Sequence, residues 1–509
     1  MPVRKRLFCV LLTTVLLFSL IWAGILDNYA EEEEMKNQVV TKDTITIWYS
    51  DENLTDYINS MGLQYYEDTD VRVEAKYVEK DEFVDYVNQA SVIGKGPDLY
   101  ITTNDDLEML TLAGLASVIT DPMKVLGTDA FSQGALNAVT YDYNLMAYPF
   151  YFETSVFLYN KTHLNTIAEN TYEEEQVDEE SMEEFSEEEL SEAAEEEVTE
   201  EAEADSEGTE EDTTEEAVVE LTAEEVEFIE NTSEAIVPAS ILDIINFADS
   251  YKAPDEVSAI FKWDVNDIFY NYFFVGKYLS IGGEFGDDYE QINIYNADTM
   301  ACLSVYQQLN QFFSIDSTEV DSDDVLDEFI NGEIIFTIVT TDAMAKLEEA
   351  VAEGNMQYEY GIARIPALTE TYGSRSLSVT DCVVVNGYSE HKDYANEFAE
   401  YLTYNGAANL YARTGKVACR ADVEYDNAWM DTALNEYASS ISLPKMLRTG
   451  NFWIQLEVLF SRVWEGEDIN LWLRTLGEQV AAQVTGKEVT LPEIETVEVD
   501  LGIVGDDDE

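Results

Sequence analysis

The sequence predicts an α/β fold for the main part of the chain. Residues Thr44–Tyr49 (TITIWY) alternate as a strand does, and Val71–Val78 form a second such run. A helical stretch over Asp81–Ser91 follows, and the glycine turn in Gly94–Thr102 leads into a third strand. Strand, helix and strand at this spacing indicate a sheet with parallel neighbours. A chain of 509 residues, 46% of them hydrophobic, can hold two or three domains with a buried core.

The composition is strongly acidic. The chain has 106 acidic and 26 basic residues, and its net charge is -80. We therefore expect no nucleic-acid partner, because phosphates would be repelled. The two histidines form no visible pattern with serine, cysteine or aspartate, and no phosphate-binding loop occurs. We expect neither an enzyme nor a cofactor or metal site.

Residues 1–26 form a targeting segment. Arg4, Lys5 and Arg6 precede an apolar run from Leu7 to Leu26. This run is longer than a signal-peptide core of about 7–15 residues and close to the roughly 20 residues that span a bilayer. We predict an uncleaved membrane anchor with the rest of the chain outside the cell; a cleaved signal peptide is the alternative. Residues 27–43 are predicted to be an acidic tether.

The stretch Tyr148–Lys161 (YPFYFETSVFLYNK) is the most apolar and aromatic run outside the targeting segment, and it favours an extended chain. Pro149 indicates that the strand begins at a sheet edge or a bulge. Glu153 lies inside this run, where an unpaired buried carboxylate would cost several kcal/mol. Glu153 is therefore either paired or faces a wet cleft where a ligand could contact it.

A Glu-rich segment interrupts the pattern. Residues Glu169–Glu234 contain 32 acidic residues and no lysine or arginine, so like charges repel along the segment. We predict a disordered insertion over 166–235, whose role the sequence leaves open. The three cysteines beyond it, Cys302, Cys382 and Cys419, match no metal motif and are interpreted as small buried hydrophobic residues.

The remaining chain alternates helices and strands again, and its last residues, 487–509, are acidic and predicted to be unstructured. Asp267–Gly283 is an aromatic stretch that ends in two glycines, which predicts a helix with a stop. The other expected helices and strands are Pro238–Tyr251, Ala259–Trp263, Asp298–Phe312, Asp323–Asn331, Ile334–Val339, Tyr360–Pro366, Leu377–Asn386, Lys392–Leu402, Ile454–Trp464 and Leu471–Val484.

Several of these segments resemble the extracellular solute-binding proteins of the maltose/maltodextrin-binding type (family 1). The resemblance is carried by YP…E…YNK at 148–161, G-x-GPD at 94–98, YG-x-x-x-x-P at 360–366 and FW at 452–453. It implies a periplasmic-binding-protein type II fold with two α/β lobes and three crossings, near Glu153, Ile365 and Val417. The expected organisation is anchor 1–26, tether 27–43, lobe 1 at 44–152, hinge strand 153–165, insertion 166–235, lobe 2 at 236–365, lobe 1 return at 366–417, lobe 2 and C-terminal helices at 418–486, and tail 487–509.

The resemblance also implies binding residues. Trp453 matches a tryptophan that stacks on a sugar ring, and aromatic faces suit the apolar face of sugars. Asp105 and Glu153 occupy matching positions, and Asp51 and Glu52 match an acidic loop. The further candidates are Tyr270, Tyr272 and Asp342, the last where the family often has a tryptophan. Asn53 and Asp106 stand where the family has basic contacts.

The expected function is that of an extracellular receptor of an ABC importer. It would act as a monomer, bind a carbohydrate, in particular an oligosaccharide, in a cleft between lobes, and deliver it to the permease subunits. Two alternatives stay open. The chain could be a membrane-tethered sensor or adhesion protein that reuses the lobes, or its acidic residues could bind a cationic solute such as a polyamine.

Overall fold

A computed structural model describes residues 44–79, 82–126, 129–173, 176, 221–425, 427 and 429–502. The predicted anchor, the tether and most of the Glu-rich insertion lie outside these ranges. Within them, no helix combines the length and the apolar character needed to cross a membrane.

The chain divides into two compact units. Unit 1 contains the chain up to Phe152 and Thr380–Glu424, and unit 2 contains Glu153–Val379 and the chain from Tyr425 onward. The first division lies inside strand β6 (Tyr148–Asn160), at the expected crossing. The other two lie at Val379/Thr380 and Glu424/Tyr425, and thus differ from the expected positions near Ile365 and Val417.

Strand pairing explains where the second and third crossings fall. Strand β12 (Leu377–Val385) is shared: Leu377 pairs with Ile441 in unit 2, whereas Asp381 pairs with Thr103 in unit 1. Val417 pairs with Phe152, so the chain is still in unit 1 at the expected third crossing. These partners are far apart in sequence, which is why local patterns could not place the boundaries.

Unit 1 contains the predicted β-α-β arrangement. Its sheet has the order β2-β1-β3-β12, in which β1 is parallel to β2 and β3, and β12 is antiparallel to β3. The first strand spans the predicted residues, and the short strand β13 pairs with the start of β6. The strands are β1 (Thr44–Tyr49), β2 (Arg72–Tyr77), β3 (Leu99–Thr103), the β4 (Thr140–Tyr141) and β5 (Asn144–Leu145) hairpin, and β13 (Val417–Ala418).

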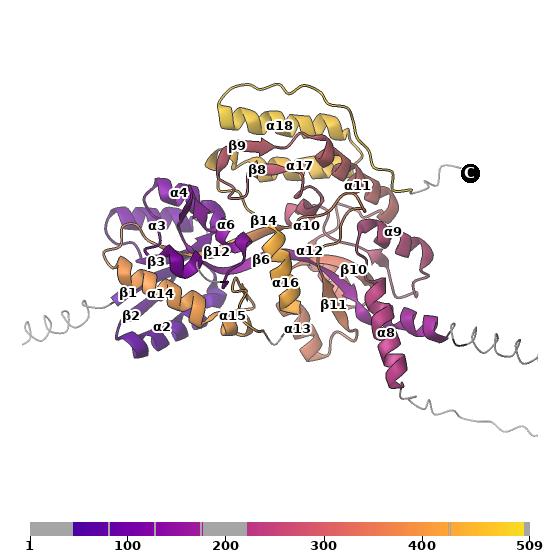
Figure 1. Cartoon of the computed structure of the whole chain (residues 1–509), viewed down its shortest axis with the longest axis horizontal. Coiled ribbons are helices and arrows are strands. Elements are labelled where there is room, and N and C mark those ends of the chain that lie inside the picture. Colours follow the sequence, from indigo (N-terminus) through magenta and orange to yellow (C-terminus); the bar gives the residue numbers. More distant parts are fainter. Residues whose placement is uncertain are drawn as a thin grey trace, which may run out of the picture. The chain divides into compact units, whose positions relative to one another are not determined.

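Helices α2, α14 and α15 of unit 1 pack against one another beside this sheet (Figure 1). Gly62 allows α2 to approach β2, because a Cβ atom there would lie 3.0 Å from Cβ of Val73. The helices of unit 1 are η1 (Glu52–Leu54), α2 (Thr55–Thr69), α3 (Phe83–Val92), η2 (Asn104–Asp106), α4 (Leu107–Leu112), α5 (Pro122–Leu126), α6 (Gln133–Ala138), α14 (Lys392–Asn405) and α15 (Ala407–Thr414).

Unit 2 is built on the second half of β6. This half pairs antiparallel with both β10 and β11, and β10 continues in parallel to β7. β6 is buried along nearly its whole length, as its apolar sequence predicts. The strands are β7 (Ala259–Phe261), β8 (Ser280–Gly282), β9 (Asp288–Asn293), β10 (Ile334–Thr340), β11 (Tyr360–Ala363) and β14 (Ile441–Ser442), of which β8 and β9 form a hairpin.

Helices α11, α17 and α18 of unit 2 pack together, with α17 and α18 at the yellow end of the colour scale (Figure 1). The helices of unit 2 are 161–173, α8 (Ala223–Ile236), α9 (Ile241–Ser250), α10 (Ile268–Asn271), η3 (Tyr272–Phe274), α11 (Ala297–Phe313), α12 (Ser322–Ile330), α13 (Ala343–Glu353), α16 (Trp429–Ser439), η4 (Leu447–Thr449), α17 (Phe452–Trp464) and α18 (Ile469–Thr485).

Both ends of the range expected to be disordered, 166–235, are helical. Helix α8 begins with a capping box, in which Thr222 and Glu225 each bond the other's backbone. Phe228 packs on Tyr172 with ring centroids 5.1 Å apart. The high density of acidic residues predicted disorder here. The few apolar residues among them pack against each other and stabilise the two helical ends.

The expected helix over Asp267–Gly283 is not formed. The chain makes the short turns α10 and η3 and then strand β8. Tyr272, Phe273 and Phe274 are all buried, so this segment packs on several sides rather than along one helical stripe. Gly276 lies so close to the Arg375 carbonyl oxygen that a Cβ atom would be 2.2 Å from it, which fixes an irregular path.

The described part of the predicted unstructured tail, residues 487–502, runs without helix or strand but is held on unit 2. The backbone N–H of Val499 donates to Ser304 Oγ at 2.9 Å, and Gln308 Nε2 donates to the Val499 carbonyl at 2.6 Å. Asn470 Nδ2 donates to the Ile494 carbonyl at 2.9 Å, and Leu501 is buried. Side chains of α11 and α18 thus supply the partners that the tail's own sequence lacks.

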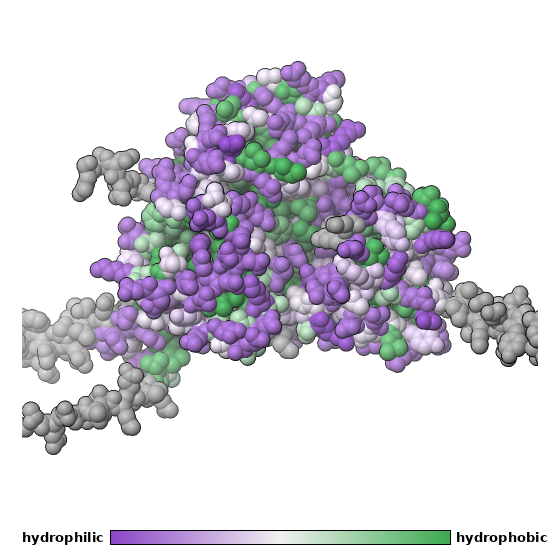
Figure 2. Space-filling view, turned by 180° about the vertical axis from the view of Figure 1, so that it is seen from behind, coloured by the Kyte–Doolittle hydropathy of each residue, from purple (hydrophilic) through white to green (hydrophobic). Residues whose placement is uncertain are grey.

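The three cysteines lie in the core, and the face drawn in Figure 2 is mostly polar. Cys302, Cys382 and Cys419 are all buried, as predicted. The face drawn in Figure 2 is mostly hydrophilic, with separated hydrophobic patches. A protein with this charge is expected to present such a solvated surface.

Candidate ligand-binding site

The acidic candidates of unit 1 follow two neighbouring strands. Asp51 and Glu52 come after β1, and Asp105 comes after β3. Because β1 and β3 are parallel neighbours, their carboxyl ends meet at one edge of the sheet. Ligands of α/β sheets bind at this kind of edge. The fold therefore places these three carboxylates, predicted from a resemblance, on the same edge of unit 1.

Lys416 adds a positive charge to this edge. Its Nζ atom lies 3.4 Å from Oδ2 of Asp51 and 5.5 Å from the ring centroid of Tyr151. The pairing of β13 with β6 brings Lys416 there, since Ala418 is opposite Tyr151. Sequence patterns next to the acidic loops could not reveal this lysine. Lys416 lies more than 360 residues after Asp51 in the chain.

Asp105 and Asp106 form a close acidic pair after β3. Burial, followed by the charge of Asp105, raises the pKa of Asp106 to about 6, although Thr102 Oγ1 donates to its Oδ2 at 2.5 Å. Oδ1 of Asp105 is buried and has no hydrogen-bond partner in the structure. A buried carboxylate oxygen of this kind is suited to accept a bond from a ligand.

Glu153 is half-buried and is the first residue of unit 2. Its neighbour Thr154 is fixed on two sides. Thr341 N–H donates to the Thr154 carbonyl at 3.0 Å, and Thr154 Oγ1 donates to the Leu377 carbonyl at 2.8 Å. This anchoring holds the backbone of Glu153 between β10 and β12.

Tyr270 and Asp342 are brought together by Thr340 at the end of β10. The Tyr270 hydroxyl lies 3.3 Å from Thr340 Oγ1, and Thr340 Oγ1 donates to the Asp342 carboxylate. Burial raises the pKa of Tyr270, so its phenol stays protonated at neutral pH. A neutral phenol beside a carboxylate can donate to one ligand hydroxyl while the carboxylate accepts from another.

Trp453 lies in the first turn of α17 and is half-buried. Its ring centroid is 5.8 Å from that of Tyr272 and 5.0 Å from that of Phe452. Tyr272 itself is only 3% exposed. Tyr272 therefore packs against Trp453 and has little surface of its own to offer a ligand in this structure.

Residues 60–436 match the family described as bacterial extracellular solute-binding protein. The chain belongs to this family. Its members are non-catalytic binding proteins, so this chain is a solute-binding protein of an ABC uptake system and not an enzyme. No curated protein matches the chain by sequence.

Solved structures confirm the binding-protein fold of this solute-binding protein. A cyclo/maltodextrin-binding protein complexed with maltotetraose has a TM-score of 0.64 and 16% identity, covering 88% of this chain and 97% of its own. An extracellular solute-binding protein from Staphylococcus aureus in complex with maltose has a TM-score of 0.63 and 14% identity, covering 88% of this chain and 98% of its own. The maltose-binding periplasmic protein MalE from Listeria monocytogenes, also in complex with maltose, has a TM-score of 0.62 and 17% identity, covering 88% of this chain and 99% of its own.

Within each unit, the solute-binding protein groups several of the predicted residues. Unit 1 places Asp51, Glu52 and Asp105 on one sheet edge, with Lys416 as an unforeseen member. In unit 2, Tyr270 is linked to Asp342 through Thr340, and Trp453 contacts Tyr272. Thr340 could not be predicted as a link, because a threonine at a strand end is common.

Proposed function

We propose that the protein captures a neutral oligosaccharide and delivers it to the permease of an ABC importer. The choice of a sugar rests on the position of Trp453. Its half-buried indole rests on the buried Tyr272 ring, so it is held in place while part of it stays accessible. A fixed aromatic face is the group that packs on the apolar face of a sugar ring.

Polar groups in both units support the same choice. Asp51, Glu52 and Asp105 in unit 1 can accept hydrogen bonds from sugar hydroxyls, as can Glu153 and Asp342 in unit 2. Lys416 offsets part of the acidic charge beside Asp51, which suits a neutral ligand more than an isolated acidic cluster would. The three solved relatives named above hold maltose or maltotetraose, which makes glucose oligomers the first ligands to test.

A thermal-shift screen tests the proposal. The protein is heated with neutral oligosaccharides and, separately, with polyamines. A ligand at 100 times its dissociation constant adds about 2.7 kcal/mol of stability, which shifts the melting temperature measurably. The sugar proposal fails if polyamines give the shift and none of the oligosaccharides does.

A cationic solute is the second candidate, and one observation favours it. Asp105 has a buried oxygen without a partner among the described residues, and beside it burial, followed by the repulsion from Asp105, raises the pKa of Asp106 to about 6. A bound cation would relieve this repulsion, so its binding should release protons and tighten as the pH rises through about 6. Isothermal titration calorimetry in two buffers of different ionisation enthalpy would count those protons. A neutral sugar would release fewer.

Delivery to the permease and attachment to the membrane are also proposals. Uptake of the identified solute by cells that carry the permease genes, with and without this protein, tests delivery. Mass spectrometry of the mature protein tests whether residues 1–26 remain as the anchor, because cleavage would remove about 26 residues' mass. Retention of a full-length chain that responds to solute without uptake would favour the sensor alternative.

A further inference from the structure

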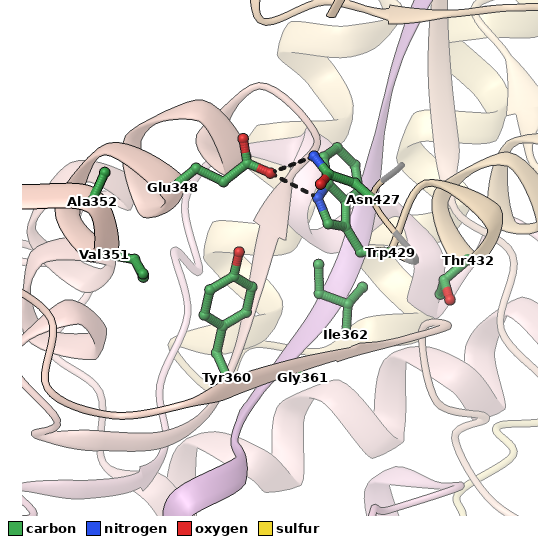
Figure 3. A pocket seen from close by; sticks show the side chains of 9 residues that line it. All are labelled: Glu348, Val351, Ala352, Tyr360, Gly361, Ile362, Asn427, Trp429 and Thr432. Atoms are coloured by element: carbon green, nitrogen blue, oxygen red, sulfur yellow. Dashed lines mark hydrogen bonds between the residues drawn. The ribbon is translucent and has the colours of Figure 1, made fainter. Parts of the chain in front are cut away.

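Unit 2 contains a cavity of about 680 Å³ that shares no residue with the candidate ligand-binding site. Its walls come from α13, β11 and the start of α16, and Figure 3 shows their side chains. A cavity of this volume falls within the range of about 300–1,000 Å³ that small-molecule sites have. We call it the α13–α16 pocket.

A fixed carboxylate forms one wall of the α13–α16 pocket. Oε1 of Glu348 accepts hydrogen bonds from Asn427 Nδ2 at 2.8 Å and from the Trp429 indole N–H at 3.0 Å (Figure 3). Both donors are neutral, so they orient the carboxylate without cancelling its charge. The second of these bonds also orients the indole of Trp429, which lines the pocket.

Strand β11 supplies the opposite wall. Tyr360 and Ile362 are two residues apart and project from the same side of the strand (Figure 3). Gly361 lets the strand pass over Tyr159, because a Cβ atom there would lie 2.0 Å from that ring. The pocket therefore combines two aromatic rings, aliphatic side chains and one carboxylate.

The charge around the pocket is strongly negative. The segments 343–363 and 429–439, which supply most of its lining, hold six acidic residues and one basic residue. That basic residue, Lys346, lies 2.9 Å from Asp327, and the neighbouring Arg364 lies 3.1 Å from Glu436. Neither cation is among the residues that line the pocket. The field there attracts cations, and it gives a neutral sugar no advantage.

From these observations we propose that the α13–α16 pocket is a second binding site, which takes a small alkylammonium ion. The ammonium group would pair with Glu348, and the carbon chain would lie against Trp429, Tyr360 and Ile362. Aromatic faces attract such cations by a cation–π interaction in addition to the ion pair. The site goes beyond the proposed sugar binding and does not depend on it.

Calorimetry of the whole protein with 1,5-diaminopentane tests this proposal at about 0.15 M salt, where surface charges are screened beyond about 8 Å. The neutral analogue 1,5-pentanediol has the same chain and terminal hydroxyls in place of the amines. We expect saturable one-site binding of the diamine and none of the diol. Absence of saturable diamine binding, or equal binding of the diol, overturns the proposal.

Matched variants locate the binding. Glu348→Gln keeps an acceptor for Asn427 and Trp429 but removes the charge, and it should weaken diamine binding by about tenfold or more. Glu349→Gln removes an exposed charge from the adjacent position, outside the pocket lining, and should leave binding within about twofold. Equal losses in the two variants would mean non-specific attraction to an acidic surface, and the proposal would be wrong.

Two further variants separate this pocket from the sugar site and from a folding defect. Trp453→Ala should leave diamine binding unchanged; a loss there would place the diamine at the candidate solute site and contradict the proposal. Tyr360→Phe keeps the ring and removes only the hydroxyl, so it should retain most of the affinity. Circular dichroism of each variant verifies the fold before titration, and the proposal is rejected if folded Glu348→Gln binds like wild type.

Discussion

Nζ of Lys416 lies 3.4 Å from Oδ2 of Asp51, although the two residues are at opposite ends of unit 1 in sequence. Both side chains are largely buried, at 16% and 25% exposure. An ion pair with this degree of burial is more than a surface contact, because removal of one partner leaves the other charge poorly solvated. The pair fixes the loop after β1, where two of the predicted ligand contacts lie.

We therefore expect Lys416→Met to destabilise the protein by about 1–3 kcal/mol and to weaken solute binding. Urea unfolding at pH 7 measures the first effect. Lys124→Met is the control, because the pair of Lys124 with Glu400 is more exposed and should be worth less than about 1 kcal/mol. Equal losses in the two variants would show that burial of the Asp51 pair has no energetic consequence.

The raised pKa of Asp106 makes a prediction about stability and pH. The folded protein favours the protonated carboxyl, with a pKa of about 6 against a usual value of 3.8. Its contribution to stability is complete below about pH 4 and is lost as the pH rises through about 6. Asp106→Asn should therefore be more stable than wild type above pH 6, by up to about 3 kcal/mol, with the difference vanishing near pH 4.

A companion variant checks the cause of that shift. Asp105→Asn removes the second contribution to the raised pKa, so the pH dependence of stability should move to lower pH. Urea unfolding of the three proteins between pH 4 and 8 gives all the curves. A pH profile that is the same in wild type and Asp106→Asn would rule out this account of the pair.

Trp453→Ala should reduce affinity for the identified oligosaccharide by at least about thirtyfold, since a central aromatic contact is typically worth 2 kcal/mol or more. Calorimetric titration measures the change. Trp472→Ala on α18 is the control: it also removes a half-buried indole, one whose N–H donates to Glu467 at 2.6 Å. If both variants bind the sugar as wild type does, Trp453 is not the platform.

The C-terminal segment should stabilise unit 2. A chain that ends at Gly486 loses the hydrogen bonds from Asn470 and Gln308 and the buried Leu501. We expect it to melt several degrees below a chain that ends at Gly502, because about 1 kcal/mol shifts the melting temperature by about 2–4 °C in proteins of 150–250 residues. Scanning calorimetry measures both chains. Identical melting curves would mean that residues 487–502 add no stability.

Most strands and helices followed from local patterns. The apolar run of β6 and the alternation of β1 gave their positions almost to the residue, because the burial of a strand depends directly on its own side chains. The helix predicted over Asp267–Gly283 was wrong, because contacts with residues distant in sequence decide the path of this stretch. Its aromatic residues predicted a helix, but the contact of Gly276 with the Arg375 backbone and burial on several sides decide its path.

The residues of the candidate site also fall into those that local segments predict and those that only the tertiary structure reveals. Trp453, Glu153 and Asp105 were predicted because each lies in a short, recognisable segment. Lys416 was not, because its role depends on the pairing of β13 with β6. Tyr272 was a candidate ligand contact, and the structure buries it beside Trp453.

By itself the sequence determined the α/β class, the order of most elements and the acidic character of the protein. Only the tertiary structure decided where β12 passes from one unit to the other, which lysine faces Asp51 and how the segment after Gly486 is held. The physical reason is the sequence separation of the interacting residues. Periodicity and turn residues record interactions between near neighbours, whereas strand pairing and ion pairs join residues hundreds of positions apart.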